Sequence, residues 1–295
     1  MKAPRRRALR RSSAWLSLWL LPSLALRAGD VSGDPIAVRI ESLSAQYIGV
    51  PYLLDPLGEG AEGSVDRDPL VRFDRFDCQT FVETVIAQAR SHTEEEFSAE
   101  LIALRYRNGE VGFATRNHFP DADWIANNVA RGALVELSGE VAGAYALAEA
   151  RTRITRRAWL LNLARNPTQA HNDYLRTHAA AQAALRAMAA TAVDGEAAVR
   201  YVPKAVLGDP TVLARVPSGA IVFVVRPHSS MLGPTGSLQN ISHFGLASRS
   251  GGRLLFRHAS SGRAHAVVDE PLASYIERLS HSHSFAGVAI YGVSP

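Results

Sequence analysis

The sequence ISHFGLASRSGGRLLFRHAS, residues 241–260, decides the fold because it predicts two β-strands joined by a tight turn. We expect Ser250-Gly251 to be a two-residue turn. In that register His243 lies directly opposite His258, on one face of the hairpin. Residues directly opposite one another have Cβ atoms about 5 Å apart, so one imidazole can accept a proton while the other orients its ring.

The segments around this hairpin predict helices in the first part of the chain and strands in the last third. The expected helices are Pro35–Ile48, Cys78–Ala89, Glu94–Arg107, Asp123–Ala130, Gln169–Ala192 and Glu270–Leu279. The expected strands are Gly219–Arg226, Ser242–Ser248, Arg253–His258, Ala264–Val268 and Phe285–Val293. This order, without a linker-like break, indicates an α+β fold in a single domain, residues 29–295.

Cys78 is the only cysteine of the chain and follows Asp77, a residue type preferred at the N-cap of a helix. Unpaired N–H groups and the positive end of the helix dipole stabilise a thiolate there and can bind an oxyanion. The alternative is that Cys78 faces the core, since it shares a helical face with Phe81, Val82 and Val85.

Residues 1–28 are typical of a secretory signal peptide, with a basic start, a short apolar run at Ala14–Leu26 and small residues near Ala25 and Ala28. A membrane anchor is the alternative, but the run is shorter than the roughly 20 residues that a span needs. Seven of the 32 basic residues and none of the 28 acidic ones lie in this segment, so the remaining chain has a net charge of −3. We therefore expect an exported protein, periplasmic or extracellular, that does not bind nucleic acid.

The remaining histidines do not indicate a metal site. His281 and His283 would share a strand face, but no HExxH motif or Cys-His cluster accompanies them. We expect no metal and no other cofactor.

Several short motifs follow one another in an order that resembles the NlpC-type papain-like peptidases of bacterial cell walls. They are GVPY at 49–52, FDCQTFVE at 76–83, SHFGLA at 242–247 and HASS at 258–261. The chain is more similar still to the N-acetylmuramoyl-L-alanine amidase-like family, through PLGEG at 56–60, RYRNG at 105–109, TRNHFPDADWIANN at 115–128 and YVPK at 201–204. One departure is the turn Pro217-Ser218-Gly219-Ala220, where related enzymes commonly have an acidic residue.

The resemblance implies a papain-like core, with the cysteine helix packed on an antiparallel sheet and with helical insertions. It implies a Cys-His-His catalytic set of Cys78, His243 and His258, with Tyr52 near the nucleophile. The reaction implied is hydrolysis of the amide between N-acetylmuramic acid and L-alanine, in peptidoglycan or in released muropeptides.

Two other functions stay open. One is an endopeptidase that cuts the stem peptide after D-glutamate, and the other is an inactive wall-binding module, which has no need of a free thiol. We expect muropeptides as the partner and no stable membrane insertion after signal cleavage. The sequence does not indicate the oligomeric state.

The stretch TRNHFPDADWIANN predicts a substrate groove, because it carries a cation, an imidazole, an indole and several polar groups within 14 residues. We expect Arg116, His118 and Trp124 to line this groove, with Arg116 able to bind a stem-peptide carboxylate. The alternative is that Trp124 anchors the core, since a large aromatic side chain is usually mostly buried.

Overall fold

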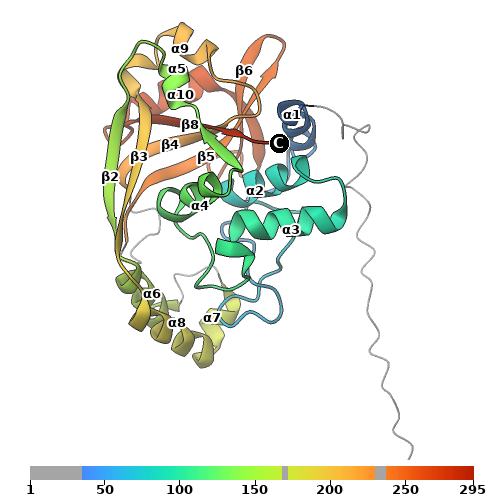
Figure 1. Cartoon of the computed structure of the whole chain (residues 1–295), viewed down its shortest axis with the longest axis vertical. Coiled ribbons are helices and arrows are strands. Elements are labelled where there is room, and N and C mark those ends of the chain that lie inside the picture. Colours follow the sequence, from blue (N-terminus) through green and yellow to red (C-terminus); the bar gives the residue numbers. More distant parts are fainter. Residues whose placement is uncertain (1–34, 168–171, 230–236) are drawn as a thin grey trace, which may run out of the picture. The chain divides into compact units, whose positions relative to one another are not determined.

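The computed structural model describes residues 35–167, 172–229 and 237–295, so the expected signal peptide lies outside the described residues. Within them, eight strands form an antiparallel sheet in the order β2-β3-β8-β4-β5-β6-β7, with β1 paired to β8 (Figure 1). The strands are β1 (Leu134–Glu136), β2 (Ala148–Ile154), β3 (Gly195–Pro203), β4 (Ile221–Ser229), β5 (Gln239–Ser250), β6 (Arg253–Ala259), β7 (Val267–Pro271) and β8 (Gly287–Val293).

The helices cover the sheet on both faces. They are α1 (Ile36–Ala45), α2 (Cys78–Ala89), α3 (Glu94–Arg105), α4 (Ile125–Ala130), α5 (Ser138–Ala142), α6 (Arg156–Arg165), α7 (Asp173–Thr177), α8 (Ala179–Thr191), α9 (Pro210–Ala214) and α10 (Leu272–Ser280). Helices α1 to α4 share one hydrophobic cluster with the sheet, and α5, α9 and α10 share another. Helices α6 to α8 form a third cluster with the residues at one end of β2 and β3 (Figure 1).

Strand β4 lies in the middle of this arrangement and is apolar on both sides. Phe223 and Val225 belong to the cluster that contains α2, whereas Val222 and Val224 belong to the cluster that contains α10. A strand covered on both faces reads as a continuous apolar run rather than as an alternation, which is what residues 221–225 show.

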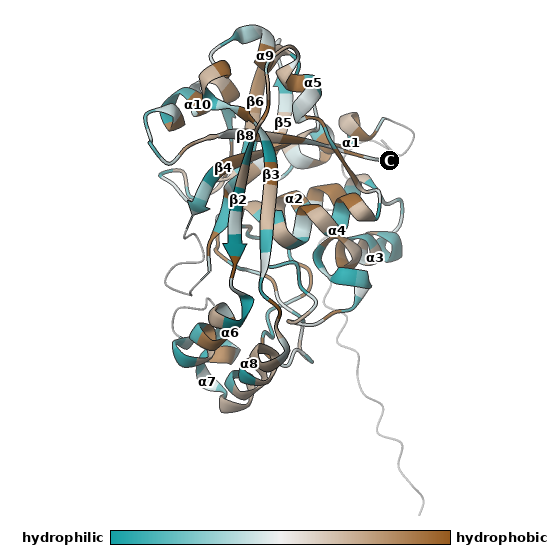
Figure 2. Cartoon of the chain, turned by 60° about the vertical axis from the view of Figure 1, so that its left-hand side comes forward, coloured by the Kyte–Doolittle hydropathy of each residue, from teal (hydrophilic) through white to brown (hydrophobic). Residues whose placement is uncertain are grey.

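The expected α+β class, with a helix packed on an antiparallel sheet, is confirmed. Helix α2 is coloured mainly as hydrophobic in Figure 2, and nine of its residues are buried. It is amphipathic only at its start, because α1, α3 and the sheet surround the rest. In the described part of the chain, no helix is both long and apolar enough to cross a membrane.

The expected register of the β5–β6 hairpin is wrong by one turn residue. The ladder pairs Leu246 with Arg257 and Ser250 with Arg253, so the turn is Gly251-Gly252. Both glycines have positive φ, 56° and 75°. A two-residue hairpin turn with positive φ at both positions favours glycine, and Gly-Gly supplies it where Ser250 would be strained.

The middle of the chain contains structure that the sequence did not predict, namely β1, β2 and β3 and the helices α5 and α6. In β2, Ala150, Thr152 and Ile154 are buried and alternate with charged residues. Small and polar side chains at buried positions weaken the period-two signal of a strand. The Ala-rich helix expected at Gln169–Ala192 is, in its described part, two helices, α7 and α8, that meet at the extended residue His178.

Candidate active site

Cys78 is the first residue of α2, as the sequence predicts. The Asp77 carboxylate accepts a hydrogen bond from the Thr80 backbone N–H at 2.8 Å, and the Asp77 N–H donates to Thr80 Oγ1 at 3.0 Å. This reciprocal capping box starts the helix at a defined residue. The thiol is therefore presented at the N-terminal end of α2.

The surroundings of the Cys78 sulfur favour its neutral form. The backbone N–H groups of Phe244, Gln79 and Cys78 face the sulfur and lower its pKa. Desolvation and then the Asp77 carboxylate raise the pKa more strongly, to about 12. The thiolate expected from the helix start is thus outweighed, and the thiol needs a base to remove its proton.

Two imidazoles and a carboxylate form a hydrogen-bonded chain close to this thiol. His243 Nε2 lies 2.7 Å from His258 Nδ1, and His258 Nε2 lies 3.2 Å from Glu270 Oε1. The other Glu270 oxygen accepts a hydrogen bond from Arg278 at 2.7 Å. The expectation that the two histidines adjoin is confirmed, but they do not pair directly across the hairpin.

Both contacts in this chain run diagonally across the sheet. Continued by one pair, the β5–β6 register places His258 opposite Gly245 rather than His243. A Cβ on Gly245 would lie 2.6 Å from Arg257 O and 2.7 Å from His258 Cβ. The missing side chain therefore leaves the room in which the His258 ring reaches His243.

The hydrogen bonds assign the tautomers. Burial raises the pKa of Glu270, but hydrogen bonds from Arg278 and His258 outweigh it and lower that pKa, so Glu270 is a carboxylate. A carboxylate only accepts, so His258 Nε2–H donates to Glu270, and His258 Nδ1 accepts from His243 Nε2–H. The remaining nitrogen of His243, Nδ1, then carries a lone pair that can accept a proton.

His243 is uncharged in this arrangement. Burial first, and then electrostatic interactions with His258 and Arg226, lower its pKa to about 3. A neutral imidazole is the form of histidine that acts as a base.

The strand β5 connects this imidazole to the thiol. His243 directly precedes Phe244, whose N–H faces the Cys78 sulfur. Among the described residues no hydrogen bond joins Cys78 to His243. Tyr275 on α10 packs against both imidazoles, at ring-centroid distances of 6.5 Å and 5.3 Å. The pKa of Tyr275 is raised by burial first, then by Glu270, with a smaller contribution from Cys78.

Tyr52 lies near the start of α2, as the resemblance implied. Its backbone pairs with Phe76, two residues before Cys78, and Phe76 N–H donates to Pro51 O at 3.0 Å. The pKa of the Tyr52 hydroxyl is raised by burial first, then by the nearby charges of Asp77 and Cys78. The hydroxyl is thus within electrostatic range of the thiol.

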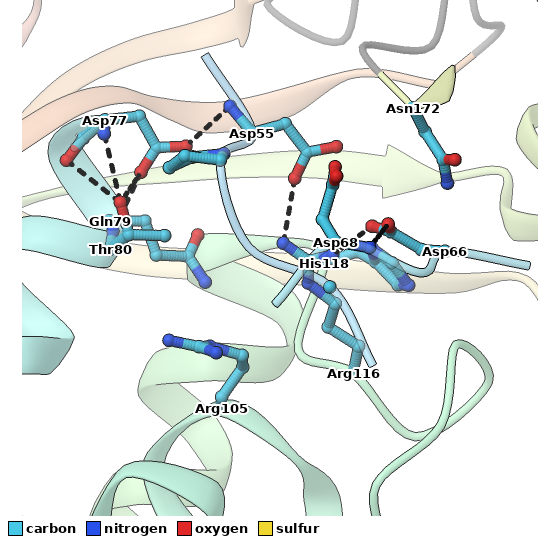
Figure 3. A network of polar contacts seen from close by, with 12 residues as sticks. Asp55, Asp66, Asp68, Asp77, Gln79, Thr80, Arg105, Arg116, His118 and Asn172 are labelled. Carbon is cyan, nitrogen blue, oxygen red and sulfur yellow. Dashed lines mark hydrogen bonds and ion pairs between the residues drawn. The ribbon is translucent and has the colours of Figure 1, made fainter. Parts of the chain in front are cut away.

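The guanidinium of Arg116 is held in a buried ion cluster (Figure 3). Its guanidinium donates to Asp55 at 2.8 Å and to Asp66 at 3.1 Å, and Glu59 lies 3.9 Å away. Asp55 has the left-handed φ of 51°, and its N–H donates to the Asp77 carboxylate at 3.1 Å. Arg116 is therefore occupied by protein carboxylates and supports the cap of the Cys78 helix.

Trp124 is fully buried and packs against Phe223 and Phe244, so the groove prediction is wrong for this residue. The core-anchor alternative holds because the indole fills the space between α4 and the sheet. His118 and Arg116 do line a cavity of about 610 Å³, together with Phe113, Asn127 and Trp159. Its walls do not include Cys78, His243 or His258.

His118 is held in the wall of this cavity rather than exposed to it. Its Nε2 bonds to Phe113 O at 2.8 Å, and its ring contacts the ring of Trp159. Burial first, then the charge of Arg116, lowers its pKa to about 3.

Sequence reasoning missed Glu270, Gly245 and Tyr275. The strand β7 pairs Val268 with His258, so Glu270 is the residue two positions further along the neighbouring strand. That position depends on the β6–β7 pairing, which the β5–β6 turn does not determine. No group of His, Cys, Asp or Glu within the described ranges is arranged to hold a metal ion.

Known proteins with this fold include amidases. Protein LPG0564 from Legionella pneumophila str. Philadelphia 1 is 29% identical, with a TM-score of 0.82 over 90% of this chain and 91% of its own. An N-acetylmuramoyl-L-alanine amidase from Bacteroides uniformis is 25% identical, with a TM-score of 0.62 over 88% of this chain and 99% of its own. No curated protein sequence matches the chain.

The family model described as N-acetylmuramoyl-L-alanine amidase-like matches residues 42–282, which include every residue of the candidate site. The chain therefore belongs to the N-acetylmuramoyl-L-alanine amidase-like family.

Proposed function

We propose that this protein is a cysteine-dependent N-acetylmuramoyl-L-alanine amidase, with Cys78 as nucleophile, His243 as base and His258 as the residue that orients it. The observation that carries the proposal is the chain His243–His258–Glu270, whose first member directly precedes Phe244, the residue whose N–H faces the Cys78 thiol at a helix start. Membership of the amidase-like family supports the substrate class, since it implies peptidoglycan. A nucleophile, a base and an orienting group in hydrogen-bonding order are the parts that covalent acyl transfer needs.

The reaction proceeds in two steps. His243 Nδ1 takes the thiol proton as the Cys78 sulfur attacks the lactyl carbonyl carbon, and backbone N–H groups at the start of α2 bind the oxyanion. The protonated His243 then donates to the nitrogen of L-alanine, whose bond to the carbonyl breaks and leaves a thioester. Water, deprotonated by His243, hydrolyses the thioester and regenerates the thiol.

The fold is consistent with a papain-like core of the NlpC type. The helix that carries the cysteine packs on β5, and β5 and β6 carry the two histidines. In this arrangement the nucleophile and the base come from different layers of the domain, so the fold rather than local sequence aligns them.

Mass spectrometry of the products tests the proposal. Defined muropeptides should yield the free sugar with its lactyl carboxylate and a stem peptide that starts with unmodified L-alanine. The Cys78→Ala variant should be folded and inactive. Cleavage after D-glutamate would instead identify an endopeptidase, and binding without cleavage would identify a wall-binding module.

We propose that residues 1–28 direct export and are removed, which places the enzyme in the periplasm or outside the cell. The basic start and the short apolar run at Ala14–Leu26 support this. Sequencing the N-terminus of the protein from its native host tests it. A chain that retains Met1 would contradict it.

A further inference from the structure

Arg226 lies on the same face of the sheet as the catalytic imidazole. The β4–β5 ladder pairs Val224 with His243, and alternate residues of a strand share a face. Val224 belongs to the cluster that contains Phe256 and Tyr275, which are also the ring neighbours of His243. Arg226, two residues after Val224 in β4, lies on this face just beyond a β-bulge, where the β4–β5 register shifts between Val224 and Val225.

The guanidinium of Arg226 has no protein anion among the described residues. It donates a hydrogen bond of 3.3 Å to the Ser284 hydroxyl. The segment that follows β4, SMLGPTG at 230–236, contains no aspartate or glutamate. The hydrogen bond to Ser284 lies at the surface, so the guanidinium can bind an anion with two acceptor oxygens without giving up a protein carboxylate.

The other arginines around the site contrast with Arg226. Arg257 binds the Asp269 carboxylate at 2.7 Å and 2.8 Å, and Arg278 binds Glu270 at 2.7 Å. Arg105 binds Glu83 at 2.8 Å. Unlike these three, Arg226 has no carboxylate partner among the described residues, so its guanidinium is available to a ligand.

The position of Arg226 selects one side of the scissile bond. His243 protonates the departing amine, so groups beside His243 face the leaving peptide rather than the sugar. The positive charge of Arg226 acts on both His243 and Tyr275, which places it within electrostatic range of that leaving group. In a stem peptide the residue after L-alanine is D-glutamate, joined through its side chain, so its α-carboxylate is free.

We propose that Arg226 binds the free α-carboxylate of the second residue of the stem peptide and makes the enzyme selective for stems in which this carboxylate is not amidated. This inference rests on the proposed function, because it names a substrate contact of the same site. It assigns to Arg226 the carboxylate recognition that the sequence suggested for Arg116, whose guanidinium is already occupied by Asp55 and Asp66.

Two substrates that differ only at this group test the inference. One is an N-acetylmuramoyl tripeptide with a D-glutamate α-carboxylate, and the other is the same compound with an α-carboxamide. Wild-type enzyme should prefer the carboxylate by about tenfold or more in kcat/KM, the scale of a charge-assisted hydrogen bond. Arg226→Gln should lose that preference because its kcat/KM falls for the carboxylate substrate alone. Arg226→Lys should retain part of the preference.

Arg253→Gln is the matched control, because Arg253 is exposed at the far end of β6 and should leave the preference unchanged. Equal rates on the two substrates, or a preference that survives in Arg226→Gln, would overturn the inference and leave the proposed function intact. If wild-type enzyme cleaves neither substrate at the lactyl amide, the proposed function itself fails, and the inference fails with it.

Discussion

His243 and His258 are hydrogen-bonded at 2.7 Å although they are not opposite one another in the β5–β6 ladder. The bond runs diagonally over Gly245. Because a glycine is all that separates the two imidazoles, the orientation of the proposed base depends on a residue that has no side chain.

Gly245→Ala should therefore impair activity. The added methyl would meet backbone and Cβ atoms at 2.6 Å and 2.7 Å, which cannot rotate away. We expect overpacking to lower the free energy of unfolding by about 1–3 kcal/mol. We also expect kcat to fall in the protein that remains folded, because His258 is displaced. Gly139→Ala is the control, since nothing lies within 4 Å of a Cβ there. Unchanged kcat in Gly245→Ala would show that His258 does not orient the base.

Glu270→Gln should lower kcat more than it raises KM. The neutral amide can donate to His258 Nε2, which reverses the tautomer of His258 and so removes the lone pair from His243 Nδ1. We expect kcat to fall by about tenfold or more. The loss of general acid–base catalysis altogether would lower it further. Glu277→Gln, exposed on the following helix α10, should behave as wild type. Steady-state kinetics and the melting temperature measured together distinguish a positioning effect from unfolding.

Alkylation of Cys78 should accelerate with pH without reaching a plateau below about pH 10. Desolvation and Asp77 raise the pKa of the thiol to about 12, so the reactive thiolate is scarce at neutral pH and grows about tenfold with each pH unit. The rate constant for iodoacetamide, followed by intact mass, measures this on the single cysteine. A plateau between pH 5 and 7 would instead indicate a preformed thiolate–imidazolium pair.

Arg116→Gln should destabilise the protein, because it removes the cation from a buried cluster of carboxylates. The side chain is 9% exposed and contacts Asp55 and Asp66. Breaking such a cluster from one side costs about 3–5 kcal/mol, so we expect a clear fall in melting temperature. Arg107→Gln removes an exposed arginine from the wall of the adjacent cavity and serves as the control. If Arg116→Gln melted like wild type but lost kcat/KM, Arg116 would contact substrate after all.

Glu59→Gln should stabilise the protein at high pH and not at low pH. Both Glu59 oxygens are buried without a hydrogen-bond partner, and burial raises the pKa from 4.5 to about 8 despite the attraction of Arg116. Between these values the folded state holds a proton that the unfolded chain releases, so stability falls as pH rises through this window. Glu59→Gln and the wild type should melt at nearly the same temperature at pH 4, and Glu59→Gln should melt at the higher temperature at pH 8. Exposed Glu62→Gln should show no such trend.

Local sequence determined the features that depend on neighbouring residues. The cap of Asp77 places the start of α2 at Cys78, and Thr93 caps α3 by accepting from the Glu96 N–H at 3.1 Å. Both caps were predictable because a capping side chain bonds to its own chain two or three residues further on. The adjacency of His243 and His258 was also predictable although the turn was misplaced. Shifting the turn by one residue moves the pairing by two positions, which keeps both side chains on one face.

Only the tertiary structure decided which polar residues serve the site and which serve the fold. Glu270, Arg116 and Trp124 lie in segments that are equally polar or aromatic, yet Glu270 reaches His258 while the other two are enclosed by protein. Their roles follow from partners far along the chain, such as Asp66 for Arg116, 50 residues away. Burial and charge pairing depend on how the sheet and its covering helices come together. Neither hydrophobic periodicity nor motif spacing predicts which residues far apart in the sequence become neighbours.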